Sequence, residues 1–171
     1  MIINKKVCII GGFAVGKTSL VHRYVLSEFS PIYKATLGVN IHKYSDTIKT
    51  QNKGEIMVNQ VIWDVEGSTT RQELLKNYIR GSSGTLVVGD VSREDSLDDM
   101  ITHAELFEKI CPARPIVFAF NKIDLLQTPF VYDGNLYQRF GGLALQTSAA
   151  TGHAVLELFR TLAARIIELG V

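Results

Sequence analysis

The chain has 171 residues, a formal net charge of +1 and an apolar fraction of 46%, which fits one globular domain and excludes a disordered chain. The near-zero charge excludes bulk electrostatic binding of nucleic acid and a polybasic segment for acidic lipid. Two cysteines, four scattered histidines and short apolar runs exclude a disulfide framework, a metal cluster and a membrane span, so we expect a cytoplasmic chain with reduced cysteines.

Apolar runs alternate with helical patterns along the chain. The expected elements, in order, are strand 7–10, helix 17–27, strands 42–50 and 55–63, helix 71–80, strand 85–88, helix 92–110, strands 116–120 and 143–147, and helix 155–169. Ser92 is the expected N-cap of the third helix, and residues 51–54 form the expected hairpin turn. This alternation predicts an α/β fold, a six-stranded and mostly parallel sheet with one antiparallel hairpin and flanking helices, in a single domain over 1–171.

A glycine-rich motif joins the first expected strand to the first expected helix. Gly11 to Thr18 match the pattern G-x-x-x-x-G-K-[ST]. Backbone N–H groups of such a loop wrap phosphates, and the following helix adds the positive end of its dipole. We expect Lys17 to reach the β- and γ-phosphates and the Thr18 hydroxyl to ligate Mg²⁺. The alternative is a structural turn that is merely rich in glycine.

A second motif indicates which base is bound. Asn121-Lys122-Ile123-Asp124 directly follow the expected strand 116–120. A carboxylate can accept hydrogen bonds from N1–H and the 2-amino group of guanine, a donor pair that adenine lacks, so Asp124 is the candidate for base selection. Asn121 can serve the O6/N7 side of the base or tie neighbouring loops, and Lys122 can lay its stem over the base. The alternative is a solvated loop of ordinary turn residues.

With these motifs the chain resembles a small GTPase of the Ras superfamily, and most of all the Rab branch, from about Val7 to about Leu169. Four further segments carry the resemblance: Thr36–Val39 (switch I), Trp63–Gly67 (switch II), Tyr78–Gly81 and Thr147–Ala149. The resemblance implies the P-loop NTPase fold, GTP/GDP and Mg²⁺ as ligands, and a molecular switch read by effector and regulator proteins. It implies no nucleic-acid partner.

The resemblance also assigns roles to individual residues. Thr36 would bind Mg²⁺ and sense the γ-phosphate, Asp64 would hold a Mg²⁺-bound water, and the Gly67 N–H would meet the γ-phosphate. Phe29 would cover the guanine face, and Tyr33 would close over the phosphates. In the segment Thr147–Ala149, a backbone N–H would read guanine O6. The implied metal residues are Thr18, Thr36 and Asp64. The implied nucleotide-binding residues are Gly11, Phe13, Ala14, Val15, Gly16, Lys17, Thr18, Ser19, Phe29, Tyr33, Thr36, Gly67, Asn121, Lys122, Asp124, Ser148, Ala149 and Ala150. Singly, each could be an ordinary loop, cap or core residue.

Three departures from the family pattern fall where the family carries out hydrolysis. Ser68, followed by Thr69, stands where a glutamine orients the attacking water, and it is too short to reach the same place. Glu66 replaces a usual alanine, and its carboxylate could face the phosphate or Mg²⁺, or point away and pair with a lysine. Phe13 would crowd the approach of an arginine finger, which is worth about 10³–10⁵ in rate.

These departures predict GTP binding with slow hydrolysis, or a rearranged mechanism that uses Glu66, Ser68 or a partner residue. Gly67 and Lys17 complete the catalytic candidates. The alternative is a GTP-binding interaction module held mainly in one nucleotide state, with little or no GTPase activity. A small P-loop kinase or ATPase is a third reading, which the short chain and the residues 121–124 disfavour.

The remaining departures concern the base pocket, the partners and the membrane. Ala150 stands where the family has a lysine, and the connection from Ile41 to Trp63 is longer than in typical Rabs, which predicts a longer hairpin that could be a partner surface. Ile41, Trp63 and Tyr78 match an aromatic triad that reads effectors, or else they only fill the switch interface. The chain ends without prenylation cysteines and does not begin with Met-Gly, so we expect no lipid anchor in it. Peripheral membrane association would need a lipidated tail missing from this sequence or a recruiting partner.

Overall fold

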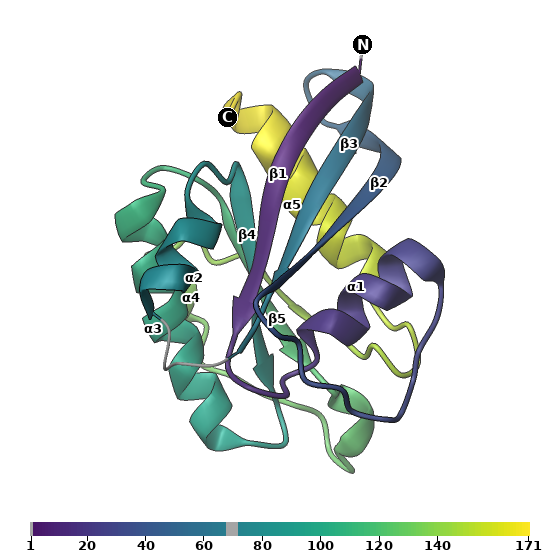
Figure 1. Ribbon diagram of the computed structural model, residues 1–171, viewed down its shortest axis with the longest axis vertical. Coiled ribbons are helices and arrows are strands. Elements are labelled where there is room, and N and C mark those ends of the chain that lie inside the picture. Colours follow the sequence, from purple (N-terminus) through teal and green to yellow (C-terminus); the bar gives the residue numbers. More distant parts are fainter. Residues whose placement is uncertain (1, 68–71) are drawn as a thin grey trace.

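The computed structural model describes residues 2–67 and 72–171, which form a sheet with helices on both faces (Figure 1). The strands are β1 (Ile2–Gly11), β2 (Val39–Thr50), β3 (Gly54–Val65), β4 (Gly84–Asp90), β5 (Ile116–Asn121) and β6 (Ala144–Gln146). Their order across the sheet is β2-β3-β1-β4-β5-β6, and every neighbouring pair is parallel except β2 and β3. The predicted six-stranded sheet with one antiparallel hairpin is confirmed.

Two helical layers bury the two faces of this sheet. The helices are α1 (Lys17–Leu26), α2 (Gln72–Ile79), α3 (Glu94–Ile110), α4 (Asn135–Gln138) and α5 (Val155–Leu169). Helices α1 and α5 cover one face, and α2 and α3 cover the other (Figure 1). Because side chains alternate along a strand, Ile9 enters the core beneath α1 and α5 while Ile10 enters the core beneath α3. Strands that are buried on both faces in this way read as continuous apolar runs.

The beginning of α3 corrects one expectation. Arg93, not Ser92, occupies the N-cap position, and it makes no side-chain cap. The Ser92 hydroxyl donates instead to the Asp90 carboxylate at 2.6 Å, and the Ser96 hydroxyl lies 2.8 Å from the Asp90 N–H and 2.9 Å from its carbonyl oxygen. A charged acceptor two residues upstream is a stronger partner for Ser92 than a helix N–H, so the serine closes a local turn.

The long β2–β3 hairpin packs along α5. Its residues Ile48, Ile56 and Val58 are buried together with Ala163 and Ile167 of α5. At the hairpin turn, the Lys53 ammonium group donates to the Ile167 carbonyl at 2.7 Å, near the helix C-terminus, where the dipole favours a cation. The face of the hairpin that carries these apolar residues is therefore occupied within the chain, whereas Met57 on the other face is exposed. The use of the hairpin as a partner surface stays a prediction.

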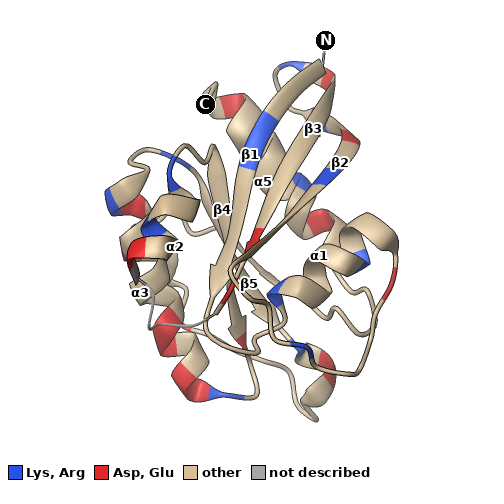
Figure 2. Cartoon of the chain, in the orientation of Figure 1, with Lys and Arg blue, Asp and Glu red and all other residues tan. Residues whose placement is uncertain are grey.

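The topology places loops from separate parts of the chain at one end of the sheet. In Figure 1 the arrowheads of β1, β4 and β5 point toward this end, and both chain termini lie at the other. In open α/β sheets the ligand binds at the carboxyl ends of the strands. The charged residues of α3 are mostly acidic, whereas α2 and α5 carry both signs (Figure 2). Among the described helices, none combines the length and the apolar character needed to cross a bilayer.

Candidate functional site

A cavity of about 620 Å³ opens at the carboxyl end of the sheet. The predicted residues that line it are Phe13, Ala14, Val15, Gly16, Lys17, Thr18, Ser19, Phe29, Tyr33, Thr36, Glu66, Gly67, Asn121, Lys122, Asp124, Ala149 and Ala150. Gly11, Asp64 and Ser148 lie behind this wall and hydrogen-bond to Lys17, Thr18 and Asp124 respectively. Ser68 and Thr69 lie outside the described residues. The structure therefore gathers the predicted set around one cavity, and its ligand stays a prediction.

The loop between β1 and α1 holds a buried ammonium group. Lys17 is 6% exposed, and its Nζ donates to the carbonyl oxygens of Gly11 at 3.0 Å and Gly12 at 2.6 Å. Burial lowers the pKa of Lys17 to about 8, although the Asp64 carboxylate opposes the shift. Gly67 packs against this loop so closely that a Cβ there would lie 2.4 Å from the Gly12 carbonyl oxygen, so only glycine fits. Switch II therefore contacts the loop between β1 and α1 through the backbone of Gly67, which has no side chain.

Three side-chain oxygens converge beside Lys17. The Thr18 Oγ1 lies 2.6 Å from the Thr36 Oγ1 and donates to the Asp64 Oδ2 at 2.6 Å. Asp64 is fully buried, and its Oδ1 has no hydrogen-bond partner among the described residues. Burial raises the pKa of Asp64, while the hydrogen bond from Thr18 and the charge of Lys17 act in the opposite direction. Hydroxyl and carboxylate oxygens are the ligands that Mg²⁺ prefers, so these residues fit that cation.

Asn121 ties three loops together at the end of β5. Its Oδ1 accepts hydrogen bonds from the Thr147 hydroxyl at 3.1 Å and the Ala149 N–H at 3.3 Å. Its Nδ2 donates to the Val15 carbonyl at 3.0 Å. Of the two roles considered for Asn121, the structure displays the tie between loops. Gly16 permits this contact, because a Cβ there would lie 2.3 Å from the Asn121 Nδ2 and the residue has a positive φ of 101°.

The residues that follow Asn121 are held by their own partners. The Ser148 hydroxyl donates to the Asp124 Oδ1 at 2.6 Å, which fixes the orientation of an otherwise exposed carboxylate. The Lys122 ammonium group donates to the Ala14 carbonyl at 2.7 Å and to the Asp90 Oδ2 at 2.6 Å, while the residue borders the cavity. Burial raises the pKa of Asp90, but hydrogen bonds from Lys122 and Ser92 prevail and hold it below its usual value.

Glu66 contacts the backbone of switch I. The Gly38 N–H donates to the Glu66 Oε2 at 2.7 Å, and the Glu66 N–H donates to the Gly38 carbonyl at 2.9 Å. Among the described residues the Glu66 carboxylate has this backbone partner and no ion pair with a lysine. Its facing the phosphate or Mg²⁺ stays a prediction. Gly38 of switch I is therefore held at both its N–H and its carbonyl by a single residue of switch II.

An aromatic pair stands over the cavity. The Phe13 and Tyr33 rings lie edge to face, with centroids 5.4 Å apart, and both side chains are more than half exposed. The Phe13 backbone is held in place by Arg93, whose Nη2 donates to the Phe13 carbonyl at 2.8 Å. The pair joins the loop between β1 and α1 to the segment that precedes switch I. Arg93 belongs to no sequence motif, so sequence reasoning missed this support.

Ile41, Trp63 and Tyr78 form a neighbouring surface. Ile41 pairs directly with Trp63 across the β2–β3 hairpin, and Trp63 lies 6.4 Å from Tyr78 between ring centroids. The Lys6 ammonium group lies 3.8 Å from the centroid of the Trp63 ring. Ile41 is 52% exposed. The three positions are thus contiguous, and their recognition by effectors stays a prediction.

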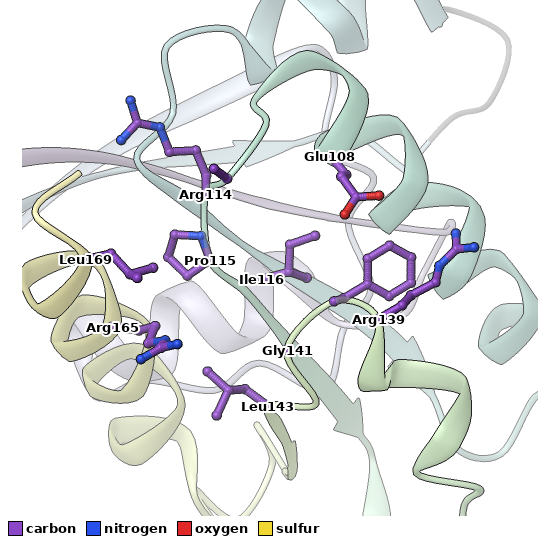
Figure 3. Close-up of a pocket in the computed structure, with 11 residues that line it drawn as sticks. Glu108, Arg114, Pro115, Ile116, Arg139, Gly141, Leu143, Arg165 and Leu169 are labelled. Atoms are coloured by element: carbon purple, nitrogen blue, oxygen red, sulfur yellow. The ribbon is translucent and has the colours of Figure 1, made fainter.

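A smaller cavity of about 210 Å³ lies at the start of β5, at the other end of the sheet. Arg114, Arg139, Arg165 and Glu108 surround an apolar floor that includes Ile116 (Figure 3). Arg139 pairs with Glu105, and Arg165 lies 3.6 Å from Glu168. Two of the three arginines are therefore partners of nearby glutamates, and exposed pairs of this kind contribute little energy.

Known proteins were compared with the chain. The Ras family model matches residues 6–168. Ras-related protein RABG3a of Arabidopsis thaliana is 37% identical over 125 residues, which cover 70% of this chain and 58% of that protein. GTP-binding protein YPT52 of Saccharomyces cerevisiae is 28% identical over 192 residues, covering 96% of this chain and 82% of YPT52. DnaJ homolog subfamily C member 27 of Bos taurus is 33% identical over 173 residues, covering 96% of this chain and 62% of that protein. The chain therefore spans less than two thirds of the plant and bovine relatives.

Proposed function

The chain belongs to the Ras family of small GTPases, and we propose that it is a Rab-like GTP/GDP switch that hydrolyses GTP slowly. The observation that carries the proposal is the arrangement around one cavity of Lys17, the oxygens of Thr18, Thr36 and Asp64, and the carboxylate of Asp124. We place residues 1–171 in a single guanine-nucleotide-binding domain.

Guanine would be recognised by groups that already have fixed positions. The Asp124 carboxylate, oriented by Ser148, would accept hydrogen bonds from N1–H and the 2-amino group. The Ala149 N–H, whose hydrogen bond to the Asn121 Oδ1 is 3.3 Å long, would donate to O6 when the base is bound. Phe29 would cover one face of the base, and the stem of Lys122 would lie along the other. Adenine has no such donor pair to offer the Asp124 carboxylate. Binding of an adenine nucleotide would therefore be weaker, because it would leave that charged group without a partner on the base.

The phosphates would be held by the loop that precedes α1. Its backbone N–H groups would wrap the β-phosphate, and Lys17 would bring a positive charge to the β- and γ-phosphates. Thr18, Thr36 and Asp64 would hold Mg²⁺, which when bound supplies further positive charge to the same oxygens. Loss of the γ-phosphate would release Thr36 and Gly67, and with them the two switches.

Slow hydrolysis is supported by the residues at positions where the family carries out hydrolysis. Ser68 replaces the water-orienting glutamine of the family. The Glu66 carboxylate is engaged by the Gly38 N–H, so it is a poor candidate for a general base in that position. The exposed Phe13–Tyr33 pair would crowd the approach of an arginine finger. Effector and regulator binding at Ile41, Trp63 and Tyr78 belongs to the same proposal.

Single-turnover hydrolysis of GTP by the purified protein tests the proposal. We expect a rate below the roughly 10⁻⁴ s⁻¹ of an unassisted small GTPase. Ser68→Gln should raise it about tenfold or more, and Ser68→Ala should leave it unchanged. A wild-type rate at or above the ordinary value, insensitive to Ser68→Ala and Glu66→Ala, would contradict slow hydrolysis.

A further inference from the structure

Arg23 of α1 belongs to no motif, yet three of its contacts lie around the proposed base pocket. Its Nε donates to the Ala149 carbonyl at 2.8 Å, and its Nη2 donates to the Ala150 carbonyl at 2.6 Å. Its guanidinium carbon lies 5.9 Å from the centroid of the Phe29 ring. The side chain is half-buried and lies between the loop after β6 and Phe29, in the segment between α1 and β2.

The two hydrogen bonds restrain the backbone of Ala149 from its carbonyl side. Asn121 Oδ1 accepts from the Ala149 N–H, and Arg23 holds the Ala149 carbonyl. Ala150 has only a methyl side chain, so the segment has no long side chain of its own at this position. A guanidinium group presents its donors as a rigid fork, which spans two successive carbonyls in a way that a lysine ammonium group does not.

The third contact involves an exposed ring. Phe29 is 39% exposed and lies between α1 and β2, in a stretch without regular secondary structure. A guanidinium within about 6 Å of an aromatic centroid attracts the ring by a cation–π interaction. Arg23 therefore joins the ring that would cover the base to the loop that would read its edge.

We propose that Arg23 is a positioning residue for guanine recognition, which sets both the residence time of the nucleotide and its discrimination at O6. This inference rests on the proposed function, since it takes the larger cavity as the guanine site. Arg23 does not touch the base itself. Through the Ala149 carbonyl it restrains the conformation of the residue whose N–H would donate to O6, and it restrains the Phe29 ring that would cover the base.

Release of GDP and 6-thio-GDP, measured by stopped flow, separates this role from general support of the fold. The thio analogue keeps the groups that Asp124 would bind and replaces O6 with a weak acceptor. Wild type should release the analogue several-fold faster than GDP, because one hydrogen bond is worth a factor of roughly 2 to 13. Arg23→Met should release GDP roughly tenfold faster than wild type, with the ratio of the two rates falling toward one.

Two further variants make the test specific. Arg23→Lys retains a donor for one carbonyl and should restore part of the GDP residence time. Arg165→Met makes the same change at a half-exposed position of α5, beside the smaller cavity at the other end of the sheet. This variant should release both nucleotides at the wild-type rates. Unchanged GDP release in both Arg23 variants, or equal acceleration of both nucleotides with an unchanged ratio, would overturn the inference alone. Failure of wild type to bind GDP would overturn the proposed function as well.

Discussion

The contact between Glu66 and Gly38 makes a quantitative prediction about switch I. Glu66→Ala removes the acceptor that lies 2.7 Å from the Gly38 nitrogen and leaves the backbone bond between the same residues in place. A hydrogen bond to a charged group contributes about 1.5–3 kcal/mol. Because Glu66 is half-buried, we take the lower end of that range. The equilibrium between closed and open switch I should therefore shift roughly tenfold toward the open state.

Amide hydrogen exchange of the GDP-bound protein measures this shift, because no γ-phosphate then holds switch I. Exchange over residues 36–39 should accelerate roughly tenfold in Glu66→Ala and by less in Glu66→Gln, which keeps a neutral acceptor. Glu55→Ala, which removes an exposed glutamate near the opposite end of β3, is the matched control and should leave switch I unchanged. Equal protection of these amides in wild type and Glu66→Ala would refute the reasoning.

Two predictions concern the stability of the hairpin and α5. Ile48→Ala creates a cavity at a fully buried position between the hairpin and α5. It should lower the free energy of unfolding by about 2–4 kcal/mol in urea titrations without changing the m-value. A loss below about 1 kcal/mol would contradict this packing. Hydrogen bonds from Arg160, opposed by burial and assisted by Tyr24, hold the pKa of Asp46 below its usual value. This contribution is present above the unfolded pKa of about 4 and is lost as pH falls through the lower folded value. Asp46→Asn should therefore destabilise the protein at pH 7 and progressively less at pH values below about 4; a pH-independent loss would argue against the charged pair.

The sheet and the ends of its strands could be predicted because they depend on local patterns. Apolar runs such as 116–120 identify strands that are buried on both faces, and the motifs at 11–18 and 121–124 follow two of them. Since the carboxyl ends of parallel strands share one edge, the motifs had to meet there. The helix α4 was missed because four residues are too few for a helical period to be visible.

The features that sequence reasoning missed depend on contacts between distant residues. Arg23 reaches a loop more than 120 positions away, and no spacing in the sequence announces that contact. Glu66 stands at a conspicuous position, but its choice of a backbone N–H over a lysine is decided by where switch I runs. The Ser92 hydroxyl could have capped α3 or bound the Asp90 carboxylate, and in the structure it binds the carboxylate. In each case the pattern identified a polar group, and tertiary structure selected its partner.

Equilibrium competition between GDP and xanthosine diphosphate tests most directly whether the larger cavity is a guanine site read by Asp124. Wild type should bind GDP far more tightly than xanthosine diphosphate or ADP. Asp124→Asn replaces an acceptor oxygen by an amide donor, which suits the 2-oxo group of xanthine, so its preference should invert. Inversion of the preference would support the account, whereas equal binding of GDP and ADP by wild type, or an unchanged preference in Asp124→Asn, would contradict it.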